Sequence, residues 1–388
     1  MQTHLPLTLL NTTDGQRADE ILRRCVHCGF CNATCPTYQL LGDELDGPRG
    51  RIYLIKGMLE TEKVDRVSAK HLDRCLTCRA CETTCPSGVE YGELIEIGRT
   101  YAAGKLSPPW FIALLLKIIP QPKTLRRMMT LGRFFRLLLP SKIGNLLRNK
   151  PKAENKVDVS AVNDASIILL KGCVQGVVTP EVNEHLIQVL AERNVEIRFS
   201  GSEQCCGALE LHTGSIETAK ARMRSNVEKI DSIEVETIVS TASGCGVTLK
   251  EYGRLLGDEA SNTFARKVVD VSEFLSDYRF NKRDDVATVA WHAPCSLQHG
   301  QKITSNVEKI LSDTGYELVT LKESHLCCGS AGAYSLTQPG ISNALRDRKI
   351  ANLTEKSPDV IVTANIGCQM HIGGGTDTPV LHWLELLR

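Results

Sequence analysis

The chain has 388 residues, which is long enough for two or three domains and excludes a single small module. Hydrophobic residues make up 42% and charged residues 23% of it, and these values exclude a disordered, collagen-like or coiled-coil protein. The 46 basic and 45 acidic residues give a formal charge of +1, and the chain contains 16 cysteines.

The N-terminal segment predicts where the protein resides. Its apolar run, residues 5–10, has no basic residue before it, so we expect no secretory signal and a cytoplasmic location. In a reducing compartment, so many cysteines indicate metal binding rather than disulfides.

The first eight cysteines form two copies of the pattern C-x2-C-x2-C-x3-C-P. In two-cluster ferredoxins, the first three thiolates of each copy bind one [4Fe–4S] cluster and the fourth binds the other cluster. The first predicted ligand set is therefore Cys25, Cys28, Cys31 and Cys85. The second predicted set is Cys75, Cys78, Cys81 and Cys35. A single C-x2-C pair would also suit a zinc knuckle, but two complete copies favour iron–sulfur clusters.

One helix is predicted between the two copies. Residues 51–59 show helical apolar spacing after the turn at residues 46–50. This insertion resembles the alpha-helical ferredoxin of respiratory iron–sulfur subunits. We assign residues 1–104 to such a domain with two [4Fe–4S] clusters.

A basic segment follows. Residues 97–153 contain no acidic residue and 12 basic ones, which leaves 34 basic and 45 acidic residues elsewhere, a net charge of −11. Two apolar runs, 110–116 and 134–139, are too short to span a bilayer, so no transmembrane helix is expected. We expect residues 105–160 to form a basic, apolar, helical connector. It suits an anionic membrane surface or a groove on a partner subunit, and the alternative is short helices on the protein's own core. No nucleic acid partner is expected.

The last eight cysteines belong to a repeat. The first copy contains Cys173, Cys205, Cys206 and Cys245. The second contains Cys295, Cys327, Cys328 and Cys368, at offsets of 122, 122, 122 and 123 residues. A shared period at four positions indicates two copies of one unit, which we call the first and second Cys-Cys-Gly units and place at residues 161–281 and 282–388.

Each unit is predicted to alternate strands and helices, which indicates parallel α/β architecture. The first unit has expected strands at 167–170, 195–199 and 237–241 and helices at 181–193 and 216–230. The second has expected strands at 287–291, 317–321 and 360–363 and helices at 306–314 and 341–353. The predicted fold class is therefore multidomain α+β, with a helical ferredoxin followed by two α/β units whose cysteines gather beyond the carboxyl ends of the strands.

Each Cys-Cys pair can point both thiols at one site where the chain bends, and Gly207 and Gly329 permit that bend. Four thiolates per unit fit zinc or a further iron–sulfur cluster, and the alternative is a pair of buried, inert thiols. His292 and His325 are candidate further ligands or proton carriers, although a hydrogen-bonded buried histidine is the simpler interpretation.

Five segments carry a family resemblance: residues 25–31, 42–55, 241–246, 324–332 and 363–369. With the two ferredoxin motifs and the two units, they resemble a family that includes the glycerol-3-phosphate dehydrogenase C subunit, lactate-utilisation proteins and heterodisulfide reductase. The chain looks more closely like the iron–sulfur subunits of bacterial glycolate oxidases. Heterodisulfide reductases end the unit in C-x2-C, whereas Ala242 and Asn365 stand at that position here, which argues against their five-cysteine cluster.

The resemblance implies an electron-transfer subunit that is not catalytic alone. It implies an FAD-containing partner subunit that oxidises glycolate to glyoxylate, a further flavoprotein-like subunit, and a quinone or another acceptor, with the complex peripheral at the inner face of the cell membrane. The chain itself has no G-x-G-x-x-G motif for a dinucleotide. The alternatives are a subunit of a related lactate or glycerol-3-phosphate dehydrogenase, a disulfide or quinone reductase acting at the Cys-Cys-Gly metal site, and a zinc-stabilised docking module.

Overall fold

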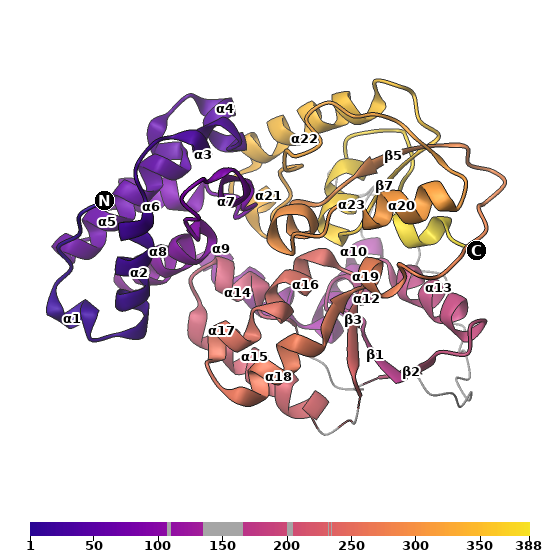
Figure 1. Ribbon diagram of the computed structural model, residues 1–388, viewed down its shortest axis with the longest axis horizontal. Coiled ribbons are helices and arrows are strands. Elements are labelled where there is room, and N and C mark those ends of the chain that lie inside the picture. Colours follow the sequence, from indigo (N-terminus) through magenta and orange to yellow (C-terminus); the bar gives the residue numbers. More distant parts are fainter. Residues whose placement is uncertain (107–109, 135–165, 200–204, 232, 234) are drawn as a thin grey trace.

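The computed structural model describes residues 1–106, 110–134, 166–199, 205–231, 233 and 235–388. These residues form a helical N-terminal part, two further helices and two α/β units (Figure 1). Residues 135–160 of the predicted connector, and the predicted start of the first Cys-Cys-Gly unit at residue 161, lie outside the described residues.

The helical N-terminal part contains α1 (Leu7–Leu10), α2 (Thr13–Arg24), α3 (Phe30–Ala33), α4 (Pro36–Leu41), η1 (Glu44–Asp46), α5 (Pro48–Thr61), α6 (Arg66–Asp73), α7 (Ala80–Thr84) and α8 (Tyr91–Lys105). The predicted helix at 51–59 is confirmed as α5. It begins earlier, at Pro48, because proline has no N–H group and the first turn of a helix needs none there. Ile21, Ile55 and Leu94 pack α2, α5 and α8 around one apolar core.

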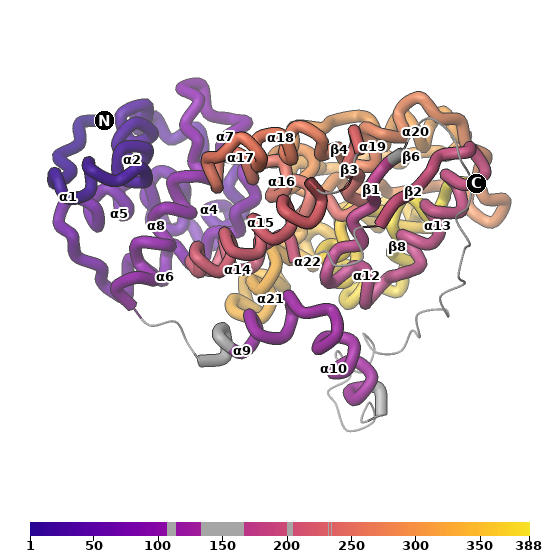
Figure 2. The backbone as a smooth tube through the Cα atoms, turned by 90° about the horizontal axis from the view of Figure 1, so that it is seen from below, coloured from indigo at the N-terminus to yellow at the C-terminus, as the bar shows by residue number. Residues whose placement is uncertain are grey.

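Helices α9 (Trp110–Ile118) and α10 (Pro122–Phe134) follow, and they lie along one side of the molecule (Figure 2). They confirm that the described part of the basic segment is helical. Helix α10 contacts α12 of the first Cys-Cys-Gly unit. Among the described residues, every helix is too short or too polar to cross a lipid bilayer.

The first Cys-Cys-Gly unit contains a parallel sheet in the order β2-β1-β3-β4. Its strands are β1 (Ser166–Leu170), β2 (Glu196–Arg198), β3 (Thr237–Ser240) and β4 (Val268–Asp270). Its helices are α12 (Gln175–Val178), α13 (Pro180–Ala191), α14 (Ala208–His212), α15 (Ile216–Asp231), α16 (Ser243–Lys250), α17 (Tyr252–Leu256), α18 (Glu259–Lys267) and α19 (Val271–Phe274).

The second unit repeats this topology with the order β6-β5-β7-β8. Its strands are β5 (Thr288–His292), β6 (Glu317–Leu318), β7 (Val360–Thr363) and β8 (Val380–His382). Its helical elements are η3 (Ser296–Gly300), α20 (Asn306–Asp313), α21 (Tyr334–Thr337), α22 (Pro339–Thr354), α23 (Ile366–Gly373) and η4 (Trp383–Leu386).

The predicted strands and helices of both units are confirmed, but the fourth strand of each sheet was not predicted. Strands β4 and β8 have three residues each, and β4 begins directly after the last residue of α18. A strand of this length without a preceding turn carries no clear alternation of apolar and polar residues. Strand β6 is shorter than expected and ends at Leu318.

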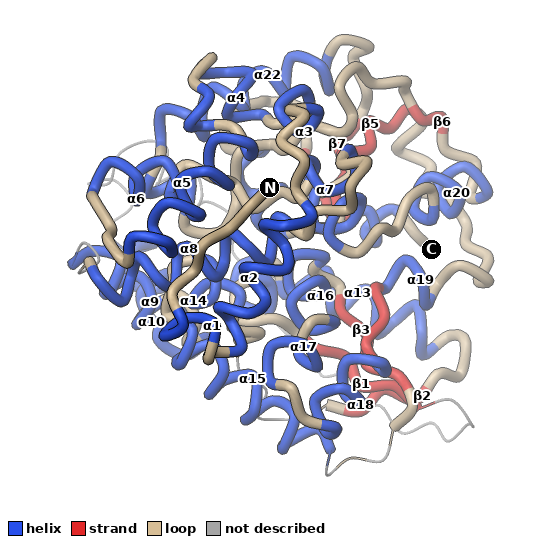
Figure 3. The backbone as a smooth tube through the Cα atoms, turned by 60° about the vertical axis from the view of Figure 1, so that its left-hand side comes forward, coloured by secondary structure: helices blue, strands red, loops and turns tan. Residues whose placement is uncertain are grey.

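The two units share one apolar core. Val239 in β3, Val289 in β5 and Trp383 in η4 belong to the same buried cluster. In the part of the chain that the structure describes, the named strands all belong to these two sheets, and the helical N-terminal part lies beside them (Figure 3). Helix α8 contacts α14 of the first unit and α4 contacts α22 of the second, so the helical part meets both units.

Candidate metal centres

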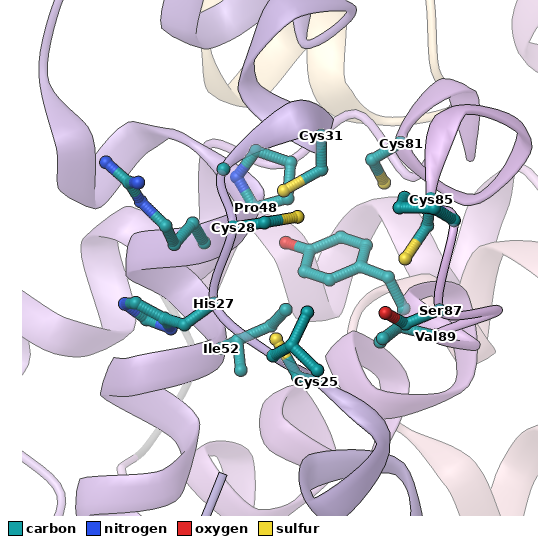
Figure 4. A pocket seen from close by; sticks show the side chains of 15 residues that line it. Cys25, His27, Cys28, Cys31, Pro48, Ile52, Cys81, Cys85, Ser87 and Val89 are labelled. Atoms are coloured by element: carbon teal, nitrogen blue, oxygen red, sulfur yellow. The ribbon is translucent and has the colours of Figure 1, made fainter.

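The first predicted ligand set surrounds one cavity. Its sulfur atoms point toward a common space (Figure 4). The cavity is lined by Cys25, Cys28, Cys31 and Cys85. Tyr91, Ile52 and Val89 form apolar walls, and Cys81 of the second set borders it. The structure therefore brings together three thiols of the first motif and the last thiol of the second.

The local backbone explains how three cysteines of one loop converge. Gly29 adopts φ +86° as the N-cap of α3, and a Cβ atom there would lie 2.5 Å from Arg49 Nη1. Glycine is the residue that enters this conformation without strain. The chain can thus turn between Cys28 and Cys31 and direct both side chains inward.

The second predicted set is more deeply placed. Three of its members, Cys35, Cys75 and Cys81, are buried, and Cys78 is half-buried. Burial raises the pKa of Cys81 well above that of a free thiol, and the neighbouring sulfur atoms of Cys78, Cys75 and Cys35 act in the same direction. All four sulfurs are therefore close enough to interact.

Hydrogen-bond donors face the sulfurs of the second set. Thr77 N donates to Cys75 Sγ at 3.4 Å, and Tyr91 Oη donates to the same sulfur at 3.7 Å. Cys35 Sγ lies 3.2 Å from Thr37 Oγ1. Donors of this kind stabilise a thiolate, which is the form that binds iron.

The raised pKa values of these thiols indicate that a bound cation is needed to form the thiolates. Burial, followed by the sulfurs of Cys25 and Cys85, raises the pKa of Cys31 to about 11. Burial raises the pKa of Cys78 well above its usual value, with Cys295 of the second unit as the next contribution. A bound cation is what converts such buried thiols to thiolates, so the donor sets fit metal clusters better than free cysteines.

The two sets differ in what surrounds them. Cys28 in the first set is exposed. In contrast, Cys78 in the second set packs with Cys295 and Cys327 of the second Cys-Cys-Gly unit, around Leu76 and Tyr334. The sequence did not predict this contact. The first set thus opens to the surface, and the second adjoins the second unit.

The four cysteines of the first Cys-Cys-Gly unit also gather, as predicted, beyond the carboxyl ends of β1 and β3. Cys173 Sγ donates to Cys205 Sγ at 3.3 Å. This bond, followed by one from Cys206, lowers the pKa of Cys205, while the pKa of Cys173 is raised. Cys206 contacts Cys245, so the four sulfurs form a continuous group.

The second unit brings together its own four cysteines. Cys295 Sγ lies 3.7 Å from Cys327 Sγ, and Cys328 contacts both Cys327 and Cys368. The bend predicted at the Cys-Cys-Gly sequence is confirmed, since Gly329 has φ +89°. A Cβ atom at this glycine would lie 2.6 Å from Ser342 O.

The prediction of a hydrogen-bonded histidine is wrong for His292. This side chain is 2% exposed, and its Nε2 atom has no hydrogen-bond partner. A ligand atom of the ring and the sulfurs of Cys328 and Cys368 lie within 4.8 Å of one another. His325 is half-buried and stands outside this group.

Three polar residues near the sulfurs were not predicted to take part in a site. Arg51, 1% exposed, donates to Thr37, which contacts Cys35. Lys349, 3% exposed, lies near Cys327, Cys328 and Cys368. Asn365 Nδ2 donates to Cys368 Sγ at 3.7 Å. Arg51 in α5 and Lys349 in α22 lie outside the cysteine motifs, so no local spacing marks them, whereas Asn365 lies three residues before Cys368.

Comparison with known proteins agrees with this organisation. A family model described as a 4Fe–4S dicluster domain matches residues 21–89, and one described as a cysteine-rich domain matches residues 167–250 and 289–373. The iron–sulfur resemblance and the fold class are thereby confirmed: a ferredoxin-like N-terminal domain is followed by two cysteine-rich units.

Curated relatives cover the whole chain. The glycolate oxidase iron–sulfur subunit of Escherichia coli (strain K12) is 42% identical over 100% of this chain and 98% of its own length. The probable glycolate oxidase iron–sulfur subunit of Bacillus subtilis (strain 168) is 29% identical over 96% of this chain and 94% of its own. Lactate utilization protein A of Bacillus licheniformis is 29% identical over 56% of this chain. The chain belongs to the family of glycolate oxidase iron–sulfur subunits.

Proposed function

We propose that this chain is the electron-relay subunit of a glycolate-oxidising complex. A partner subunit would carry FAD and oxidise glycolate to glyoxylate, a further flavoprotein-like subunit would complete the complex, and a quinone or another acceptor would receive the electrons. The observation that carries the proposal is how the two ferredoxin ligand sets lie relative to the protein surface and to the second Cys-Cys-Gly unit. The first set includes one exposed thiol, Cys28, whereas the second set has none and adjoins the second Cys-Cys-Gly unit.

The eight cysteines of the two ferredoxin motifs are the proposed ligands. One [4Fe–4S] cluster would be held by Cys25, Cys28, Cys31 and Cys85, and the other by Cys75, Cys78, Cys81 and Cys35. Such clusters accept and release single electrons, which lets a two-electron flavin reaction be handed on in single steps. The cysteines of the two Cys-Cys-Gly units, namely Cys173, Cys205, Cys206, Cys245, Cys295, Cys327, Cys328 and Cys368, are proposed as further metal ligands.

The charged residues around the two ligand sets support a direction of electron transfer between the two proposed clusters. Arg51 is a buried cation that interacts with Cys75 and Cys35 of the second set. Beside the first set, Arg49 is 33% exposed, so solvent screens its charge. A buried positive charge stabilises added negative charge more than an exposed one does. We infer that the second set is the better electron acceptor, which favours transfer from the first set, with its exposed Cys28, to the second set.

The entry point is proposed at the surface around Cys28. Val26, Phe30 and Tyr53 are 67%, 62% and 62% exposed. The ring of His27 packs edge-on against Tyr53 at 6.2 Å between ring centroids. Exposed apolar and aromatic side chains of this kind mark protein interaction sites. We therefore place the FAD-containing subunit here, where it would approach the exposed thiol group.

The connector is the proposed membrane contact. Lys123, Arg126 and Arg127 of α10 are exposed, and so are Met128 and Leu131, at 49% and 60%. Basic and apolar residues on one exposed helix fit the headgroup region of an anionic membrane. A peripheral position at the inner face of the cell membrane follows from this proposal.

The relay is tested with Cys28→Ser in the purified complex, with Cys245→Ser of the first Cys-Cys-Gly unit as the matched control. Glycolate should still bleach the flavin of the partner in both variants. In Cys28→Ser, reduction of the acceptor should fall at least a hundredfold, and iron content should fall by about four atoms per chain. Unchanged acceptor reduction in Cys28→Ser would contradict the relay.

A further inference from the structure

Three buried side chains of the second Cys-Cys-Gly unit lie at the spacing of ligands to one ion. They are His292 at the end of β5, Cys328 before α21 and Cys368 in α23, and they are 2%, 1% and 3% exposed. One ligand atom from each lies within 4.8 Å of the other two. A tetrahedral zinc ion, with bonds of about 2.0–2.3 Å, holds its ligand atoms roughly 3.3–3.8 Å apart, so a small adjustment would place all three on one ion.

The close spacing of His292, Cys328 and Cys368 distinguishes them from the cysteines of the ferredoxin motifs. Among the described residues, the other set of three candidate ligand atoms this close together is Asp43, Asp46 and His71. Asp46 is already paired there with Arg51, His71 and Arg74. The ferredoxin cysteines are spread more widely, around a cavity that could admit a cluster of several atoms. The close spacing at His292 therefore indicates a single ion.

His292 supplies a second observation, independent of the cysteines. Its Nε2 atom is buried without a hydrogen-bond partner. Cys328 and Cys368 are themselves part of an apolar cluster with Leu353, Ile361 and Ile372. A buried polar atom without a partner destabilises the fold, and a metal ion bound to it would remove that cost.

The first unit lacks this arrangement. In the two sheets, Leu170 pairs with Ser240 on β3, and His292 pairs with Thr363 on β7, so Leu170 occupies the position that His292 occupies in the second unit. Ala242 likewise corresponds to Asn365, which donates to the sulfur of Cys368. The side chains of His292 and Asn365 are thus particular to the second unit.

We propose that His292, Cys328 and Cys368 bind a single zinc ion in the second Cys-Cys-Gly unit. Two thiolates and one imidazole are donors that zinc binds well, and a fourth position would be filled by water or by the adjacent Cys327. The buried ammonium group of Lys349 offsets the negative charge of the thiolates. The site rests on the proposed function, which assigns Cys328 and Cys368 as further metal ligands, but it uses none of the ferredoxin cysteines of the relay.

The test uses the full-length chain, purified without oxygen, with iron and zinc measured by mass spectrometry. His292→Leu installs the residue that the first unit carries at this position, and His325→Leu is the matched control in the same unit. We expect His292→Leu to lose one zinc per chain relative to both the wild type and His325→Leu. The iron content should stay at about eight atoms per chain in all three proteins, which shows that the ferredoxin part is folded.

X-ray absorption at the zinc edge of the wild-type protein gives a measurement that needs no variant. The proposal expects sulfur and nitrogen together in the first coordination shell. A shell of sulfur alone, or equal zinc in the wild type and His292→Leu, would overturn it. A protein without zinc but with clearly more than about eight irons would also overturn it, since the second unit would then hold a cluster. A failure of the relay would instead appear as lost acceptor reduction with the zinc retained.

Discussion

Arg79 and Glu251 form an ion pair across the boundary between the helical N-terminal part and the first Cys-Cys-Gly unit. Arg79 Nη2 donates to Glu251 Oε2 at 3.0 Å. The two side chains are only 12% and 20% exposed. Arg79 lies between Cys78 and Cys81, so this pair anchors the loop that carries two proposed cluster ligands to the neighbouring unit.

Glu251→Gln should destabilise this boundary. The substitution keeps the shape of the side chain but leaves the Arg79 guanidinium buried without its main counter-charge, which costs about 3 kcal/mol. Guanidinium chloride denaturation followed by the absorbance of the clusters should show the loss as an earlier midpoint. The control is Glu259→Gln, whose partner Arg266 is 65% exposed and whose pair should contribute less than about 1 kcal/mol. Equal shifts in the two variants would contradict the anchoring role.

Arg51→Met should lower the reduction potential of the cluster proposed at Cys35 and Cys75. Burial opposes the charge of Arg51, yet its anionic neighbours keep its pKa above the ordinary value, so the guanidinium stays charged. Losing one buried charge should cost about 1–2 kcal/mol of stabilisation, or roughly 40–90 mV for one electron. Redox titration followed by electron paramagnetic resonance measures both clusters separately.

Arg51→Lys and Arg49→Met serve as controls for that titration. Lysine keeps the charge and should restore most of the potential. Arg49 is partly solvated beside the other set, so its loss should change that cluster less. A shift of the same size in both clusters of Arg51→Met would indicate general disruption of the fold instead of a local charge effect.

The sequence predicted the features that repeat or alternate along the chain. The two C-x2-C-x2-C-x3-C-P copies predicted which four cysteines form each ferredoxin ligand set. The period of about 122 residues predicted two copies of one unit, and their sheets have the same strand order. These signals are local, since ligands two or three residues apart and strands of four or five residues leave a regular pattern.

The contacts that the sequence missed join distant segments. Cys78 packs against Cys295 and Cys327, and Arg79 pairs with Glu251, across gaps of about 170 to 250 residues. No periodicity marks such a contact, because it depends on how folded units pack together. His292 was recognised as a candidate, but only its burial and its unpartnered Nε2 atom distinguish it from an ordinary core histidine.

His382 should make stability sensitive to acid. It lies at the end of β8, where Nε2 donates to Thr241 O of the first unit at 2.9 Å and Nδ1 accepts from Leu384 N at 3.3 Å. Burial lowers its pKa from 6.5 to about 4, although the bond to Thr241 acts the other way. Between these values the unfolded chain binds a proton that the folded chain does not. The free energy of unfolding should therefore fall by about 3 kcal/mol as the pH is lowered through this window.

His382→Gln tests this dependence, measured as urea midpoints from pH 7.5 to pH 4. His212, with its pKa lowered by burial to about 4, titrates in the same sense, whereas Glu96 and Glu385, with pKa values raised by burial to about 7, titrate in the opposite sense. The informative quantity is thus the difference between the wild type and the variant. That difference should shrink as the pH falls below 6.5, and a difference that is constant with pH would contradict the prediction.

Phe30→Glu should weaken the docking of the FAD-containing subunit. A carboxylate at the exposed position of Phe30 would have to be desolvated on binding, and aromatic anchors at such sites contribute about 2 kcal/mol or more. Cluster content should stay normal, while glycolate-driven reduction of the clusters should slow at least tenfold at limiting partner concentration. Leu336→Glu, which alters a 57% exposed apolar residue on α21, is the control and should leave the rate unchanged. Equal rates in the two variants would place the partner elsewhere.

Neutralising the exposed basic residues of α10 should release the protein from anionic membranes. The triple variant Lys123→Gln, Arg126→Gln and Arg127→Gln removes three charges, each contributing about 1 kcal/mol near an anionic surface, so binding to vesicles of phosphatidylglycerol and phosphatidylcholine should weaken about a hundredfold. Sedimentation with vesicles measures it. The control removes the same charge elsewhere, at the exposed Lys302, Lys309 and Lys356 of the second unit. If both triple variants weaken binding equally, net charge governs the attraction and α10 is not the contact.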